Sequence, residues 1–127
     1  MKMNWDTIRL ILIELEEKES SKSSISLEDF YHLDDCEKII DVSYNMALLV
    51  DEDLVKGRMF DRPDCIANDF VVYRLTLKGH QFLDGIRSET VWNKTKETLV
   101  TKGLNMTVDT ITAIAAAIGT SMLGLSV

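Results

Sequence analysis

The stretch that decides the fold is FVVYRLTLKGHQFL, residues 70–83. Five of its first six residues are β-formers, Arg74 being the exception, which predicts a strand over residues 70–75. Thr76 follows at once, and its side-chain oxygen can accept a hydrogen bond from a free N–H group at the start of a helix. We therefore expect a strand that runs directly into a helix, the join with which the wing of a winged helix commonly ends. The residues expected to share the buried face of that helix are Leu77, Phe82, Leu83 and Ile86.

The residues before this stretch predict three helices, which we expect over residues 4–18, 26–33 and 34–51. Asn4 can cap the first helix and Ser26 the second. Asp34 and Glu37, three positions apart, form the capping pair expected to open the third. Between the first two helices, residues 19–24 have neither apolar anchors nor periodicity, so we expect a flexible connection there.

The segment between the third helix and the quoted strand predicts a turn and a hairpin. A winged helix usually turns through a left-handed glycine where its third helix ends; this chain has Asp53, and aspartate tolerates that conformation better than most residues. A first strand is expected over residues 54–60, with a turn at 62–64 and the return strand over 70–75. The predicted fold is mainly α with a small β-hairpin (α+β), a winged helix-turn-helix over residues 1–87.

Residues 88–127 are expected to form a helical extension that packs on this domain or mediates dimerisation. Trp92, Thr95 and Leu99 are spaced as the buried face of one helix, and Gly103 should end it. A last helix should begin after residue 105 or 107.

The last 18 residues, 110–127, carry no charge, which places them at the lower edge of membrane-spanning length. Threonine, serine and glycine dilute their hydrophobicity, so a membrane anchor is disfavoured. Small residues at a spacing of four let another helix approach closely. We therefore expect this helix to pack on the first helix, or on its own copy in a homodimer. The residues expected at a dimer contact are Ile111, Ile114, Ala117, Ile118, Ser121 and Met122.

Composition indicates an ordered protein that needs no disulfide or metal ion to fold. The chain has 127 residues, 46% of them hydrophobic and 28% charged, and can bury a core without disulfides or a metal. Cys36 and Cys65 give no disulfide framework, and no signal-peptide pattern precedes them. We expect a protein of the bacterial cytoplasm with both thiols reduced.

Catalytic and metal-binding patterns are weak. The sequence has no glycine-rich phosphate loop and no nucleophile elbow, so we expect neither an enzyme nor a cofactor. His32 and Cys36 lie four positions apart and, with Cys65 and His80, would supply four candidate zinc ligands. Their spacing fits no standard zinc motif, which favours core thiols and a partly buried histidine instead.

Two blocks of sequence carry a resemblance to a known family. The first is matched by Asn4, Trp5, Asp6, Ile8, Arg9, Ile11, Leu12, Leu15 and Glu16, and the second by Leu75, Thr76, Gly79, His80, Phe82, Leu83, Asp84, Ile86 and Arg87, with Val91 and Trp92 shortly after. Over residues 3–104 the chain resembles a family of domains of unknown function found mainly in bacterial phages and prophages. The resemblance implies a winged-helix fold and a phage origin, but no activity. The chain departs from it in having Asn45, where a histidine is common, and in a less charged closing helix.

The charge distribution gives the first functional hypothesis. The chain has a net charge of −7, and most of the surplus lies in residues 34–54, where Lys38 is the only basic residue. A DNA-reading helix needs lysine and arginine to meet phosphates, so this helix is disfavoured for the major groove. We expect a non-enzymatic, phage-encoded protein whose acidic surface binds a host or phage protein, such as a nucleic-acid-handling or defence protein. The acidic residues are Asp34, Asp35, Glu37, Asp41, Asp51, Glu52 and Asp53; alternatively, they only cap and solubilise the helix.

The second hypothesis is a transcriptional regulator that binds DNA through its wing. The basic residues on or beside the wing strands are Lys56, Arg58, Arg62 and Arg74. Four cations make a thin patch, and exposed charges of this kind also serve to keep an edge strand from pairing.

Overall fold

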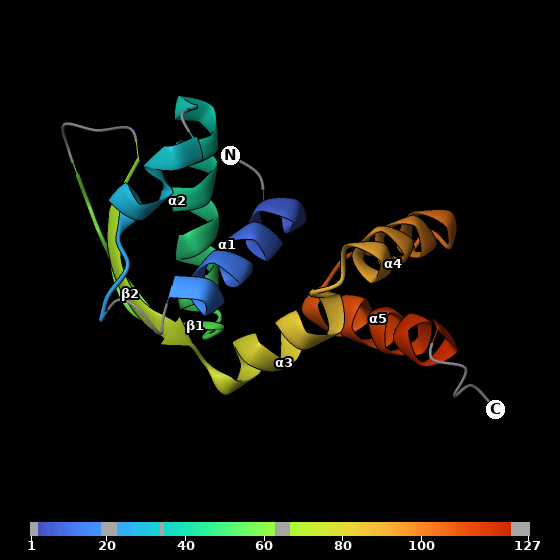
Figure 1. Cartoon of the computed structure of the whole chain (residues 1–127). Coiled ribbons are helices and arrows are strands. Elements are labelled where there is room, and N and C mark those ends of the chain that lie inside the picture. Colours follow the sequence, from blue (N-terminus) through green and yellow to red (C-terminus); the bar gives the residue numbers. More distant parts are fainter. Residues whose placement is uncertain (1–2, 19–22, 34, 63–66, 123–127) are drawn as a thin grey trace. The chain divides into compact units, whose positions relative to one another are not determined.

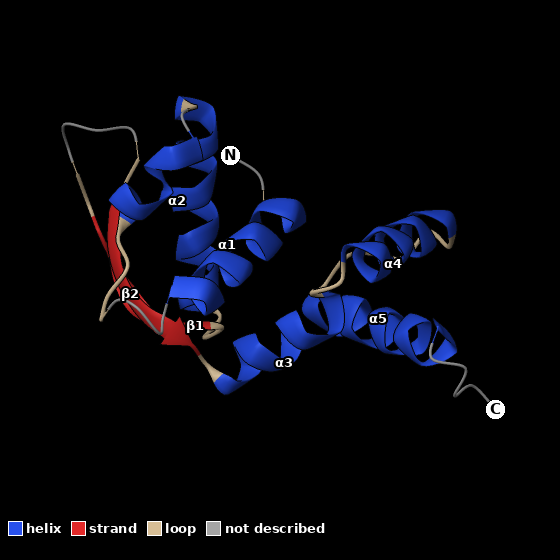
Figure 2. Cartoon of the chain, viewed as in Figure 1, coloured by secondary structure: helices blue, strands red, loops and turns tan. Residues whose placement is uncertain are grey.

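The computed structural model of the protein describes residues 3–18, 23–33, 35–62 and 67–122. These fall into two compact units, residues 1–80 and 81–127. The elements are α1 (Trp5–Lys18), the 3₁₀ helix η1 (Leu27–Leu33), α2 (Cys36–Asp51), β1 (Val55–Phe60), β2 (Asp69–Leu75), α3 (Leu77–Ile86), α4 (Glu89–Thr101) and α5 (Val108–Met122). Helices dominate, and the strands of the described residues form one antiparallel hairpin, which confirms the predicted α+β class (Figure 2).

In the amino-terminal unit α1 packs against α2, and the hairpin packs against both helices (Figure 1). η1 contacts α2 and β2. The rings of Phe30 and Phe70 meet edge to face with centroids 5.9 Å apart, joining η1 to β2. The largest fully buried side chains of this unit include Ile11, Leu12, Leu15, Ile25, Met46, Leu54 and Leu75.

The cap predicted for the first helix is present, and the capping box predicted for the second is present in its return half. The side-chain oxygen of Asn4 accepts hydrogen bonds from the N–H groups of Asp6 (3.1 Å) and Thr7 (3.3 Å). Asp29 accepts from the N–H of Ser26 at 2.9 Å, so η1 begins where expected. Just before it, Ile25 exchanges two backbone hydrogen bonds with Val72, at 2.8 and 3.0 Å.

The cap of α2 differs from the prediction by one residue. Asp35, not Asp34, is the N-cap, and it accepts a hydrogen bond from the N–H of Glu37 at 2.9 Å. The prediction places Asp34 and Glu37 three positions apart, at the spacing of a capping box. In the structure, the cap residue Asp35 accepts from the N–H of the residue two positions after it. Asp34 itself lies outside the described residues.

Asp53 adopts the left-handed conformation that the sequence predicts, with φ of 62°. Around it, Leu54 donates its N–H to Leu49 at 2.9 Å and Asp53 donates to Val50 at 3.2 Å. These two bonds form a Schellman motif, which satisfies carbonyls at the end of α2 and directs the chain into β1.

Replacing Asp53 by glycine should stabilise the amino-terminal unit by about 1 kcal/mol, because glycine reaches positive φ without the steric penalty of a Cβ. The midpoint of urea unfolding measures this change. Asp51→Gly is the matched control. It also replaces an aspartate by glycine, but Asp51 lies in the last turn of α2, where glycine brings no benefit. A midpoint for Asp53→Gly at or below that of the parent would contradict the prediction.

The hairpin contains a bulge on its second strand. Lys56 lies opposite Arg74 and Gly57 opposite Val72, so Tyr73 is an extra residue on β2. Gly57 is required beside the bulge, since a Cβ there would lie 2.5 Å from the carbonyl oxygen of Val71. The bulge turns two consecutive side chains, Tyr73 and Arg74, toward solvent.

The join between β2 and α3 is fastened to the turn at the end of α2. Thr76 caps α3 by accepting from the N–H of Gly79 at 3.1 Å, as predicted. Its hydroxyl also donates to the carbonyl of Asp53 at 2.6 Å, and its N–H donates to Leu54 at 3.0 Å. Gly79 packs so closely on Leu54 that a Cβ there would lie 2.1 Å from the Leu54 carbonyl oxygen. We call this set of contacts the Thr76 clamp.

One prediction for α3 is wrong. Phe82, Leu83 and Ile86 are buried, but Leu77 is 73% exposed. Leu77 precedes Phe82 by five positions, which at 100° per residue places it well off the buried face.

The carboxy-terminal unit packs α4 against α5. Ser88 caps α4. Gly103, with φ of 67°, follows the end of α4, as the sequence predicts. The predicted buried face is also confirmed, because Trp92, Thr95 and Leu99 are all buried. Among the described residues, no helix combines the length and the apolar character needed to cross a bilayer.

Candidate functional site

The outward side of α2 carries an apolar stripe. Ile40, Tyr44 and Ala47 follow at helical spacings of four and three, so they lie on one face. Tyr44 is 37% exposed, and Ile40 and Ala47 are half-buried. The residues buried on the opposite face are Val42, Asn45, Met46 and Leu49, while the buried Ser43 lies beside the stripe. α2 is therefore apolar on its solvent side as well as on its core side.

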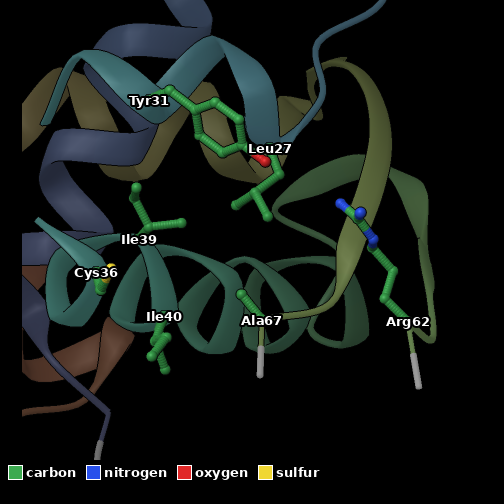
Figure 3. Close-up of a pocket in the computed structure, with 7 residues that line it drawn as sticks. All are labelled: Leu27, Tyr31, Cys36, Ile39, Ile40, Arg62 and Ala67. Atoms are coloured by element: carbon green, nitrogen blue, oxygen red, sulfur yellow. The ribbon is translucent and has the colours of Figure 1, made fainter. Parts of the chain in front are cut away.

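Beside this stripe lies a hollow of about 270 Å³, which we call the α2 hollow. Side chains from η1, from α2 and from the loop that joins β1 to β2 line it: Leu27, Tyr31, Cys36, Ile39, Ile40, Arg62 and Ala67 (Figure 3). A second hollow of about 160 Å³ shares Ile40 and Ala67 with the first. It is also lined by Tyr44 of α2 and Met59 of β1. Ser43 holds the site together by donating to the carbonyl of Asn68 at 2.7 Å.

The structure separates the predicted acidic residues into two groups. Asp35 and Glu37 are exposed at the amino end of α2. Asp51, Glu52 and Asp53 are exposed at its carboxyl end, about 21 Å away at 1.5 Å per residue. The apolar stripe lies between the two groups, so α2 presents acidic ends and an apolar middle.

Asp41 is engaged inside the amino-terminal unit. Its carboxylate accepts hydrogen bonds from the hydroxyl of Thr7 and from the side-chain amide of Asn45, the latter at 2.9 Å. Asn45 is fully buried, and its oxygen accepts from the N–H of Asn4 at 2.9 Å. This polar network joins the start of α1 to the middle of α2, so Asp41 has a structural role at this position.

The predicted wing cations lie at two places. Lys56, Arg58 and Arg74 are exposed on the hairpin strands. Arg62 instead lines the α2 hollow, and its side chain extends toward the side on which Leu27 lies (Figure 3).

The candidate zinc ligands that the structure describes, His32, Cys36 and His80, do not come together as a metal site. His32 lies with Nδ1 3.1 Å from the carbonyl oxygen of Asp29 and Nε2 3.2 Å from a carboxylate oxygen of Glu14. Cys36 is exposed at the edge of the α2 hollow. No three histidine, cysteine or acidic side chains of the described residues gather as a metal site; Cys65 lies outside those residues.

The residues predicted for a dimer contact differ in their exposure along α5. Ile111 is fully buried in its own chain, and Ile114 and Ile118 are half-buried. Ala117, Ser121 and Met122 are exposed. A second subunit would therefore meet the small and exposed residues of α5 rather than Ile111.

Sequence reasoning misses the α2 hollow. A signal for it exists, because Ile39, Ile40 and Tyr44 exceed what one buried face of a helix requires. The hollow itself needs η1 and the hairpin ends beside α2, a juxtaposition that no local pattern gives.

Comparison with known proteins places the chain among proteins of unknown function, as the sequence predicts. A family model described as a hypothetical protein (DUF2513) matches residues 2–105. An uncharacterized protein of Haemophilus influenzae is 35% identical over 123 residues, which cover 97% of this chain and 99% of that protein. No solved structure shows significant similarity. The chain belongs to the DUF2513 family of hypothetical proteins.

Proposed function

We propose that the protein is a non-enzymatic, phage-encoded winged-helix protein of the bacterial cytoplasm that binds a host or phage protein through α2 and the α2 hollow. The observation that carries this proposal is the exposed apolar stripe of α2 beside that hollow.

The order of elements supports a winged-helix assignment. α1 is followed by the extended residue Ile25, which pairs with β2, then by η1, α2 and the hairpin. This is the arrangement of helix, short strand, two helices and wing. In that arrangement α2 takes the place of the helix that reads DNA in helix-turn-helix proteins.

The chemistry of α2 favours a protein partner over DNA. Lys38 is its only basic residue, so the helix offers little to a phosphate backbone. Ile40 and Tyr44 instead offer apolar and aromatic surface, which is typical of the centre of protein interfaces. A hollow of about 270 Å³ is small for a drug-sized ligand, and it is suited to a side chain of a partner.

The charges around the stripe define the partner further. Acidic side chains lie at both ends of α2, with Asp35 and Glu37 at one end and Asp51 to Asp53 at the other. We infer that the partner segment carries an apolar side chain for the hollow and basic residues on either side. Charge complementarity of this kind speeds association and excludes acidic competitors.

Substituting the centre of the stripe should weaken partner binding. Ile40→Glu buries a carboxylate in an apolar contact, and Tyr44→Ala removes an aromatic anchor; we expect each to weaken binding at least about tenfold. The measurement is affinity capture from host lysate with tagged parent and variant proteins, followed by mass spectrometry and by titration of the captured partner.

Val100→Glu is the matched control, because Val100 is an apolar residue 75% exposed on α4 of the carboxy-terminal unit. It should capture the same partner as the parent. Circular dichroism checks that each variant is folded. If Ile40→Glu and Tyr44→Ala both retain the parent's partner and affinity, α2 is not the docking surface.

A further inference from the structure

The outer face of the hairpin carries three cations without acidic partners. Lys56 and Arg74 lie directly opposite each other on β1 and β2, and Arg58 is two positions from Lys56 on the same strand. No described carboxylate forms an ion pair with any of these three. Like charges placed directly opposite each other destabilise a sheet. Their presence on a chain of net charge −7 points to an anionic ligand.

Two aromatic rings are exposed on the same hairpin. Tyr73, the extra residue of the bulge, is 47% exposed, and Phe60 is 37% exposed. The guanidinium of Arg58 lies over the Phe60 ring at 4.8 Å from its centroid. Bulges often re-aim a side chain at a binding site, and this bulge exposes Tyr73 beside Arg74. Cations and flat rings thus share this face. Asp69, which lies opposite Phe60, accepts hydrogen bonds from the N–H groups of Leu27 and Phe70.

This surface is distinct from the α2 hollow. Side chains alternate along a strand, so Lys56, Arg58 and Phe60 lie on one face of β1 and Met59 on the other. Met59 borders the smaller hollow beside α2. The basic and aromatic residues of β1 therefore lie on the strand face opposite the one that borders the proposed protein-binding surface.

We propose that the outer face of the hairpin binds single-stranded nucleic acid. Lys56, Arg58 and Arg74 meet phosphates, while Tyr73 and Phe60 stack on bases. The two rings are separated by about 13 Å along the strands, at 3.3 Å per residue, so each takes a different base. Open aromatic rings among cations are the features of single-strand binding surfaces. In a duplex the bases are already stacked on one another and cannot reach the rings.

Fluorescence anisotropy of the full chain tests this proposal. The probes are a labelled oligothymidylate of about 20 nucleotides, an abasic strand of equal length and a duplex of equal length, at about 50 mM salt. Oligothymidylate should bind most tightly of the three. Tyr73→Ala should weaken it roughly fivefold or more and leave the abasic strand unchanged, because this variant removes a ring and no charge.

The charge contribution is tested separately. Lys56→Ala with Arg74→Ala should weaken both single strands, whereas Lys38→Ala, which removes one exposed cation from α2, should weaken neither. The logarithm of the affinity should fall against the logarithm of the salt concentration with a slope of about −2, as three phosphate contacts on a single strand require. Absence of saturable binding, equal affinity for the duplex, or an unchanged affinity of Tyr73→Ala would overturn the proposal.

Discussion

Replacing Gly79 by alanine should destabilise the amino-terminal unit by roughly 3 kcal/mol or more, a large fraction of the stability of a small domain. The added Cβ would lie 2.1 Å from the carbonyl oxygen of Leu54. That oxygen is backbone, and it is held by the N–H of Thr76, so it cannot move aside cheaply. An ordinary Gly→Ala change inside a helix gains about 0.5–1 kcal/mol. The steric clash is larger and decides the sign.

Unfolding in urea, followed by the fluorescence of Trp5, measures this effect in a Trp92→Phe background, where Trp5 is the single tryptophan. Gly119→Ala is the matched control. Gly119 is also helical, but an added Cβ there meets nothing within 4 Å, so this variant should be as stable as the parent or slightly more so. A Gly79→Ala protein that unfolds within about 1 kcal/mol of the parent would show that the Thr76 clamp yields easily.

Replacing Asn45 by leucine should cost about 2 kcal/mol, although leucine is close to asparagine in size and more hydrophobic. The N–H of Asn4 loses its acceptor, and Asp41 loses the donor that holds its carboxylate at 2.9 Å. Asn4 is exposed and Asp41 is half-buried, so each loss lies near the lower end of the about 1–3 kcal/mol that a buried polar group without a partner costs. The hydrophobic gain of one leucine does not offset two such losses in a site shaped around an amide.

The same urea experiment measures the Asn45 variant. Asn93→Leu serves as its control, since Asn93 is exposed on α4 and should change stability by no more than about 0.5 kcal/mol. Hydrogen exchange should also show faster opening at the start of α1, where Asn4 is held. Equal midpoints for Asn45→Leu and the parent would mean that the network of Asp41 and Asn45 contributes nothing net to stability.

The features that the sequence predicts correctly are those that depend on a few adjacent residues. Asn4 and Thr76 cap helices through their own side chains, and Asp53 and Gly103 reach positive φ for reasons of local sterics. The Asp34 prediction fails by one residue because neighbouring aspartates offer the same cap chemistry.

The features that escape prediction depend on residues far apart in the chain. The bulge at Tyr73 is defined only by its pairing with β1, and the role of Asp41 depends on Thr7 and Asn45. The α2 hollow depends on three segments meeting. A count of charges along residues 34–54 predicts one acidic surface. It contains no information on where each carboxylate points, so it cannot separate the two ends of α2 or place Asp41 inside the polar network.

The Thr76 clamp also determines when the amino-terminal unit can fold during synthesis. α1 and α2 leave the ribosome first, yet the turn after α2 is fastened by Thr76 and Gly79, and Ile25 pairs with Val72. These contacts join residues 23 to 47 positions apart, and such non-local contacts form late. The apolar stripe of α2 is therefore exposed beside unfinished structure until residue 79 has emerged, an interval in which a chaperone or the partner itself could reach it.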